Sequence, residues 1–342
     1  MRKLKSQHRQ VNNLLRNTVI IISRILVVAV ILVCIWSQNN FVVTRNFVYA
    51  DTDLPKSLVG YKILHISDIC NTSNNIYSIA KMSGADIIVL SGGYFDVDGN
   101  SSKTVDTVNK LCKIAPVYYI CNTNDKEDCL STTGAINITD SVIVIESDIQ
   151  DAETFVRETY GKSIIEKASK GDEEATQYLQ YIKDELSNEQ CSTIKLCGIN
   201  NMVNASNSDI QRKSLGITGA DENDLTIMVN GNLSNINTLC KTNIDIMLIG
   251  GTFGKVNDAC AYSKGDYSCL GTKLFVSGGC GNYSSKRIAN LPEVQMITLS
   301  DGTIKQNNPI ENLLDLFIDD IGTIYDNDGG FSEYTYKYGG VQ

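Results

Sequence analysis

Histidine is nearly absent from this 342-residue chain, which contains only His8 and His65. No C-x-x-C pair occurs among its 11 cysteines. Structural zinc sites take their ligands from closely spaced Cys and His residues, so the sequence argues against a zinc finger or zinc ribbon. The chain also has no internal repeat, which argues against a solenoid or a propeller.

Acidic residues are absent before Asp51, where seven of the chain's 30 Lys and Arg residues lie. All 39 Asp and Glu residues lie from Asp51 onwards, so that part of the chain has a formal net charge of −16. A surface of this charge repels polyanions. We therefore expect no nucleic-acid partner.

The basic N-terminus is followed by an apolar run from Val19 to Trp36, interrupted only by Ser23 and Arg24. Its 18 residues are near the minimum for crossing a hydrocarbon core of about 30 Å. Because the positive charge lies mostly upstream, we expect a cytoplasmic tail at 1–16, a transmembrane signal-anchor at 17–37 and the remainder outside. A cleaved signal peptide with an apolar core at 25–36 is the main alternative, and a buried core helix is another.

An exterior location permits disulfides among the ten cysteines that follow the apolar run. The short spacings favour Cys191 with Cys197 and Cys260 with Cys269. The remaining cysteines are open to either interpretation, as disulfide partners or as small buried residues. They are Cys70, Cys112, Cys121, Cys129, Cys240 and Cys280.

Short apolar runs alternate with amphipathic segments, a pattern typical of a layered α/β domain, here predicted over 40–305. Strands are expected at 61–67, 85–91, 115–121, 141–147, 193–199, 225–231, 244–250, 272–278 and 293–300. Helices are expected at 75–83, 102–113 and 234–241. A charged insert at 151–189 is predicted to form two helices, and 306–342 to form a helix and a loose tail.

The stretch "DLPKSLVGYKILHISDICN", Asp53 to Asn71, resembles the opening of calcineurin-like metallophosphoesterases, most closely a bacterial membrane-anchored group. The resemblance extends over about residues 40 to 300 apart from the insert, through "KIAPVYYI" and "TKLFVSGGCGN". It implies a four-layer α/β/β/α sandwich of two mixed sheets. It also implies phosphoester hydrolysis at two divalent metal ions (Mn, Fe or Zn), about 3.5 to 4 Å apart, at the strand exits.

Most ligand positions of that family are substituted in this chain. The family's Asp-x-His aligns with Asp68 and Cys70, and its metal-bridging acid aligns with Gly93, although Asp96 follows. Its Gly-Asn-His-Glu motif aligns with residues 122–125, which include Thr123, Asn124 and Asp125. The next histidine aligns with Gly231, or with Asn230 if one gap is allowed. The Gly-His-x-His motif aligns with 250–253, where Gly251 and Phe253 cannot ligate a metal.

Several interpretations of Asp68 and Cys70 stay open. They could hold one ion together with Asp96 or Asp125. Cys70 could instead be a nucleophile, although His65 is the only histidine nearby in the sequence. The plainer interpretations are a loop cap for Asp68 and a packed or disulfide-bonded Cys70, with Cys121 or Cys280 as the partner.

The sequence thus predicts a single-pass protein of the bacterial cell membrane with its domain outside. With so few ligands retained, we expect a catalytically degenerate domain without a cofactor, which binds or scaffolds a cell-surface protein partner. The alternative is an active phosphoesterase with an altered metal site.

Overall fold

The computed structural model describes most of the chain, and every structural statement below concerns that part. The described residues are 16–33, 41–72, 75–122, 125, 129–147, 156, 162–188, 192–200, 206–219, 225–251, 264–281 and 291–302. The predicted helix and tail at 306–342 lie outside them.

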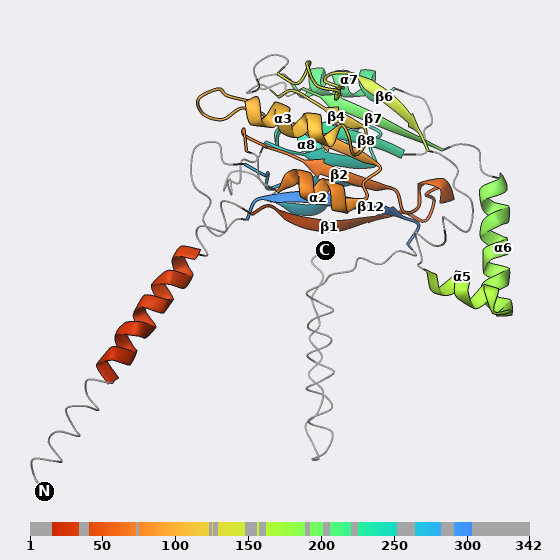
Figure 1. Ribbon diagram of the computed structural model, residues 1–342. Helices are drawn as coiled ribbons and strands as arrows, with labels where there is room; N and C mark the ends of the chain where they lie inside the picture. Colours follow the sequence, from red (N-terminus) through yellow and green to blue (C-terminus); the bar gives the residue numbers. More distant parts are fainter. Residues whose placement is uncertain are drawn as a thin grey trace, which may run out of the picture. The chain divides into compact units, whose positions relative to one another are not determined.

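The first sheet has six strands in the order β1-β12-β2-β3-β4-β5. It is mixed, because β12 runs antiparallel to β2 while its other neighbouring pairs are parallel. Its strands are β1 Val43–Ala50, β12 Glu293–Ser300, β2 Lys62–Ile66, β3 Ile87–Leu90, β4 Val117–Tyr119 and β5 Ile136–Asn137. The chain's last described strand therefore lies between its first two (Figure 1).

The second sheet also has six strands, in the order β10-β11-β9-β8-β7-β6. Its central strands are parallel, and its two edge strands are antiparallel to their neighbours. Its strands are β10 Gly265–Cys269, β11 Thr272–Val276, β9 Ile246–Ile249, β8 Leu225–Asn230, β7 Thr193–Ile199 and β6 Val142–Glu146. Both sheets are thus mixed, as the sequence predicted.

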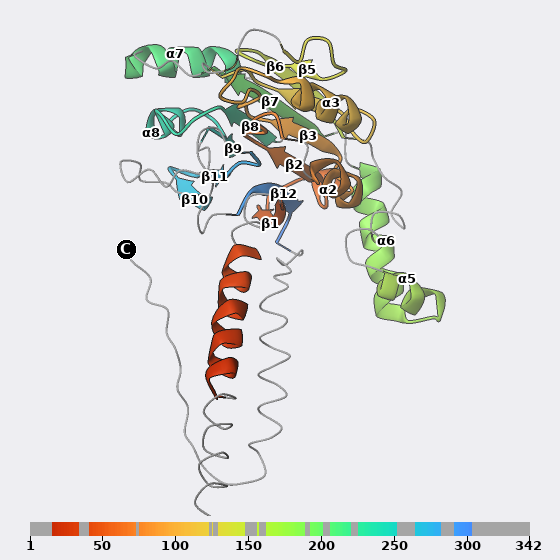
Figure 2. The same ribbon diagram turned by 60° about the vertical axis from the view of Figure 1, so that its left-hand side comes forward.

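Alternation along the strands separates three apolar clusters, which gives the fold four layers. In β2, Ile63 faces the core between the sheets, whereas Leu64 packs in a cluster with α2 and α3. In β8, Ile227 faces the inter-sheet core and Met228 packs beneath α7 and α8. The covering helices are α2 Ile76–Ser83, α3 Ser102–Leu111, α7 Asn207–Thr218 and α8 Ile236–Leu239. Figure 2 shows α2 and α3 on one side of the strands and α7 and α8 on the other.

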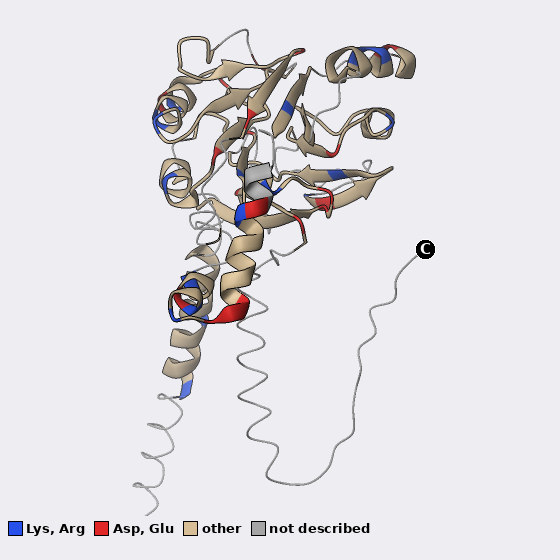
Figure 3. Cartoon of the chain, turned by 90° about the vertical axis from the view of Figure 1, so that its right-hand side faces the viewer, with Lys and Arg blue, Asp and Glu red and all other residues tan. Residues whose placement is uncertain are grey.

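Charged residues are sparse within the two sheets and more frequent on the helices that cover them (Figure 3). This distribution follows from burial, because the central strands are covered on both faces and a charge there would need a compensating partner. The four residues of β3 are all buried, as are the four of β9. Burial on both faces explains why these two strands are continuous apolar runs in the sequence.

The insert contains the two predicted helices, α5 Lys162–Ser169 and α6 Glu173–Asn188. Its charge pattern suggests a solvated hairpin, but Ile164 of α5 and Leu179 of α6 pack against the inter-sheet core, and Ile182 is buried in it. The short helix η1, Lys56–Leu58, contacts α6. The insert therefore covers part of the core.

The N-terminal helix, Arg16–Val33, is long enough and apolar enough to cross a membrane. None of its residues is buried against the rest of the chain. That exposure disfavours the buried core helix considered above. A signal sequence near the N-terminus has the same length and composition, so this helix alone does not distinguish an anchor from a leader.

All of the predicted strands and the helices around 75–83, 102–113 and 234–241 are present. The sequence analysis did not include β1, β5, β10 and α7 among its expected strands and helices. β5 has only two residues, and β10 is an edge strand that alternates between half-buried and exposed positions. α7 carries weak apolar periodicity and begins at Ser206, whose hydroxyl accepts the Asp209 N–H.

Candidate functional site: the strand exits

The exits of the two sheets come together. Asn122 follows β4 of the first sheet, and a Cβ added to Gly231, after β8 of the second sheet, would lie 2.7 Å from the Asn122 Cβ. Gly250, after β9, also lies against the first sheet. A Cβ on Gly250 would overlap the Ser91 hydroxyl and would lie 2.9 Å from the Ser67 Cβ. Backbone therefore lies against backbone where the family has its metal centre.

Asp68 is fully buried at the exit of β2 and adopts a left-handed conformation with φ of 49°. Its N–H donates to the Gly92 carbonyl at 2.9 Å, and its own carbonyl accepts the Gly281 N–H at 2.6 Å. The Ser67 hydroxyl donates to the Asp68 carboxylate at 3.3 Å. These contacts connect the exit of β2 with the loops after β3 and β11.

Two glycines enclose the Asp68 carboxylate. A Cβ on Gly93 would lie 2.5 Å from Asp68 Oδ1, and a Cβ on Gly279 would lie 2.7 Å from Asp68 Oδ2. Both glycines also have positive φ, +77° and +75° respectively. The position aligned with the family's bridging acid therefore has no room for any side chain.

Cys70 is likewise buried and has a positive φ of 48°. Its N–H donates to the Gly93 carbonyl at 2.8 Å. A Cβ on Gly281 would lie 2.7 Å from the Cys70 Cβ. Cys280, one of the partners considered for Cys70, donates its Sγ hydrogen to the Glu293 carbonyl at 3.2 Å.

Two of the positions aligned with the later histidines, Gly231 and Gly251, are also closed. A Cβ on Gly251, which has a φ of +73°, would overlap the Gly231 carbonyl oxygen. Gly231 and Gly251 therefore pack directly on each other, with no space for an imidazole on either. Phe253 lies outside the described residues, as do Thr123 and Asn124.

Asp125 holds the loop after β3 in place. Its carboxylate accepts backbone N–H groups from Tyr94 at 2.8 Å, Asn122 at 3.0 Å and Gly93 at 3.1 Å. Burial raises the pKa of Asp125, and the three backbone hydrogen bonds oppose that shift. Three backbone donors are typical of a structural cap, and they use three of the roughly four acceptor positions of the carboxylate.

Asp96 caps a different turn. It accepts N–H groups from Asn100 at 2.8 Å and Asp98 at 3.1 Å, and the Asn71 amide at 2.7 Å. The pKa of Asp96 is lowered, mainly by the Asn100 hydrogen bond. Asp96 and Asp125 therefore act as loop caps, because both carboxylates accept hydrogen bonds from backbone N–H groups near the exits.

His65 forms a buried polar network that the sequence did not reveal. Its Nδ1 is 2.9 Å from Gln295 Oε1 and its Nε2 is 2.8 Å from the Ser91 hydroxyl. Gln295 in turn donates to the Val276 carbonyl of the other sheet at 2.8 Å. Burial lowers the pKa of His65 to about 4. Both ring nitrogens have protein partners, so His65 is not poised to activate Cys70.

Glu293 is a second buried polar residue near the exits that the sequence analysis did not single out. Its side chain is fully buried, and it accepts the Gly278 N–H at 3.0 Å. Arg45 Nε lies 3.1 Å and Lys264 Nζ 3.6 Å from its Oε2. A signal was present, because a glutamate opens the otherwise apolar run "EVQMITLS". The pairing itself joins residues far apart in the chain.

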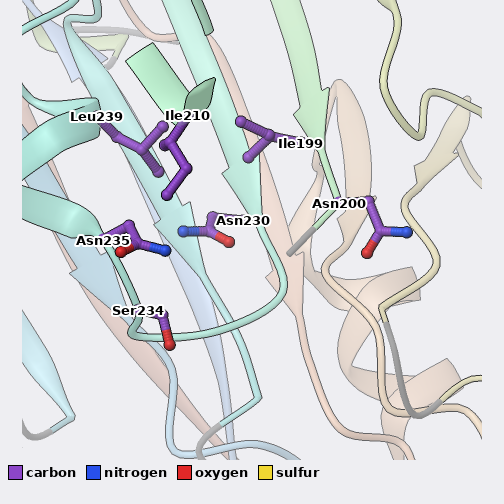
Figure 4. Close-up of a pocket in the computed structure, with 7 residues that line it drawn as sticks. All are labelled: Ile199, Asn200, Ile210, Asn230, Ser234, Asn235 and Leu239. Carbon is purple, nitrogen blue, oxygen red and sulfur yellow. The ribbon is translucent and has the colours of Figure 1, made fainter. Parts of the chain in front are cut away.

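A small cavity lies beside the exits of β7 and β8 (Figure 4). Its volume is about 10 Å³, which is room for a single water molecule. Asn230 contributes its side chain to the lining, together with Asn235 and Ser234 from the loop that follows and apolar residues of α7 and α8.

The aligned residues that the structure describes do not fit a two-metal centre. Within the described ranges, no group of three or more His, Cys, Asp or Glu residues is arranged to hold a metal ion. Gly93 and Gly279 enclose the Asp68 carboxylate, whereas Asp96 and Asp125 accept hydrogen bonds from backbone N–H groups.

Two mixed sheets between two helical layers, with the strand exits meeting at one end, define the architecture. It is the four-layer α/β/β/α sandwich of two mixed sheets that the sequence led us to expect. No protein-family model and no curated protein matches the chain. Among solved structures it is similar to TT1561 of Thermus thermophilus, at 11% identity and a TM-score of 0.35, over 64% of this chain and 90% of that chain. At these values the similarity carries no information on activity.

Proposed function

We propose that this protein is a membrane-anchored, extracytoplasmic metallophosphoesterase-fold protein that has lost catalysis and acts by binding or scaffolding a cell-surface partner. The observation that carries the proposal is the enclosure of Asp68 by Gly93 and Gly279, at hypothetical Cβ distances of 2.5 and 2.7 Å. A two-metal centre requires a bridging carboxylate and open space for ions and water. The strand exits supply neither around Asp68.

Backbone hydrogen bonds, and not only the missing ligand side chains, keep the position of the metal site closed. The loop at 67–70 is hydrogen bonded on one side to Gly92 and Gly93, and on the other to Cys280 and Gly281. Reopening a metal site would require these loops to separate, which exposes buried backbone groups. Restoring one family ligand is therefore insufficient.

An active phosphoesterase with an altered metal site is the second candidate. Asp68 favours it, because this acid is retained at a family ligand position. The additional ligands would have to come from outside the described residues, for example from 123–124 or 252–263. Metal content separates the two candidates.

The membrane anchor rests on the helix Arg16–Val33 and on the one-sided charge around it. Positive residues precede the apolar run, and the acidic part of the chain follows it. The positive-inside rule then puts the folded part outside a bacterial cell membrane. The acidic surface favours a protein partner over a nucleic acid or an anionic membrane.

The test uses the full chain purified in detergent. Manganese, iron and zinc are measured by elemental analysis, and a chromogenic phosphodiester and a phosphomonoester are assayed with each metal added. We expect far less than one metal per chain, and turnover at the background rate. The variant Cys70→His, which restores one family ligand, should behave like the wild type.

Two results would overturn the proposal in favour of the active enzyme. One is a metal content near two per chain. The other is turnover that Asp68→Asn abolishes while the melting temperature is kept. As a control for indirect effects, Asp266→Asn removes a carboxylate that pairs with Lys273 on β10 and β11, and it should leave any turnover unchanged.

A further inference from the structure

Cys240 and Cys269 lie side by side although 29 positions separate them in the sequence. The two thiols interact with each other, and the Cys269 Sγ lies 3.5 Å from Oδ1 of Asn237, three residues before Cys240. Cys240 is the C-cap of α8, and Cys269 is the last residue of β10. Cys240 belongs to the apolar cluster beneath α7 and α8, and Cys269 packs against that cluster.

Contacts from the β10–β11 turn and from α8 fix the positions of the two cysteines. Cys269 pairs with Thr272 across the tight turn at Leu270 and Gly271, which have φ values of 51° and 93°. The Thr272 hydroxyl donates to the Ile244 carbonyl at 2.9 Å and also interacts with the Cys240 thiol. The Cys269 Sγ hydrogen donates to Asn237 Oδ1 on α8 at 3.5 Å.

We propose that Cys240 and Cys269 form a disulfide that ties α8 to the β10–β11 hairpin. The inference does not depend on whether the strand exits are catalytic. It replaces the sequence-based pairing of Cys260 with Cys269, because one sulfur cannot serve both bonds. The closed covalent loop includes β9 and the segment that follows it, where the family has its Gly-His-x-His motif.

The oxidant belongs to the class of disulfide donors, such as an oxidised thiol–disulfide oxidoreductase or glutathione disulfide. The more exposed Cys269 loses its proton to solvent, attacks one sulfur of the donor and releases the other as a thiolate. Cys240 then loses its proton and attacks the Cys269 sulfur, which releases the second donor thiol. Two electrons and two protons leave the protein, and one S–S bond replaces another.

The order of attack follows from the surroundings of the two thiols. Burial, together with its contact to Cys269, raises the pKa of Cys240 to about 12. Cys240 is therefore a poor first nucleophile. Once Cys269 is part of a mixed disulfide, its contribution to that raised pKa is gone, and Cys240 is already in contact with the sulfur it must attack.

Trypsin separates the relevant cysteines cleanly. Cleavage after lysine and arginine puts Cys240 in the peptide 214–241, Cys260 in 256–264 and Cys269 in 265–273. The full chain is equilibrated in detergent with graded mixtures of reduced and oxidised glutathione, quenched in acid, alkylated and digested without reduction. We expect a 214–241 to 265–273 linked peptide to dominate as the mixture becomes more oxidising.

Melting temperatures provide a second readout. Oxidation should raise the melting temperature of the wild type by about 5 °C or more, as expected for closing a loop of this length. Cys269→Ser should remove that gain, whereas Cys112→Ser, a thiol on the other helical layer, should retain it. A dominant link between 256–264 and 265–273 would overturn the proposal. So would complete alkylation of Cys240 and Cys269 in the most oxidising mixture.

Discussion

Gly93 and Asp68 are in such close contact that a Cβ on the glycine would lie 2.5 Å from the aspartate Oδ1. Real Cβ atoms are essentially never found at such a distance from another heavy atom. The packing around Asp68 therefore requires glycine at position 93, which is the position that aligns with the bridging acid of the metallophosphoesterases.

Gly93→Ala should therefore destabilise the protein strongly. The left-handed backbone alone costs a non-glycine residue about 1 to 3 kcal/mol, and the overlap with Asp68 adds to it. Gly171→Ala is the matched control, because Gly171 has a similar φ of +82° but nothing within 4 Å of a new Cβ. Thermal or urea unfolding of the two variants measures the difference. Equal losses of stability would contradict the close packing at Asp68.

His65 should make the protein less stable in acid. Its pKa is about 4 when folded, against an ordinary 6.5, so the folded state favours the neutral ring. Stability from this group is complete above pH 6.5 and is lost as the pH falls towards 4. The loss is about 3 kcal/mol, since each pKa unit corresponds to about 1.36 kcal/mol.

Melting temperatures between pH 4 and 7 measure that loss. His65→Asn should show a flatter profile over this range, because asparagine does not titrate. If the variant does not fold, NMR of the wild type gives a second readout, in which the His65 ring should remain neutral at pH 5.5. A variant with an unchanged slope, or a ring that titrates near 6.5, would refute the prediction.

Glu293→Gln should cost about 2 to 3 kcal/mol of stability, because the buried amide no longer balances Arg45 and Lys264. The estimate is kept below that for a fully buried ion pair, since the Arg45 side chain is 44% exposed. Asp266→Asn breaks a comparable contact with Lys273 at 2.6 Å on the surface and should cost no more than about 1 kcal/mol. Urea unfolding distinguishes the two, and a smaller loss for Glu293→Gln would argue against the buried pairing.

The proposed membrane topology predicts the outcome of proteolysis in intact cells. Added protease should digest the folded part, while a tag at Met1 stays protected, because the positive charge precedes the apolar run. Digestion of both at the same rate would show that the orientation is wrong. Release of the protein into the medium with a new N-terminus after the run would instead support a cleaved signal peptide.

The sequence by itself determined the layered fold and an N-terminal helix that is long and apolar enough to cross a membrane. Buried parallel strands such as β3 and β9 are covered on both faces, so their apolar runs are visible without any tertiary information. The resemblance also singled out Asp68, Gly93 and Gly251, which follow β2, β3 and β9. These features depend on local pattern and order.

Only the tertiary structure decided how those positions contact each other. The enclosure of Asp68 by Gly93 and Gly279, and the network from His65 to Gln295, join loops and strands that are distant in the chain. The contact of Cys240 with Cys269 depends on the packing of α8 against a hairpin that the sequence did not predict. Such contacts depend on sheet order and register, and a linear pattern of residues does not encode a distance between two strands.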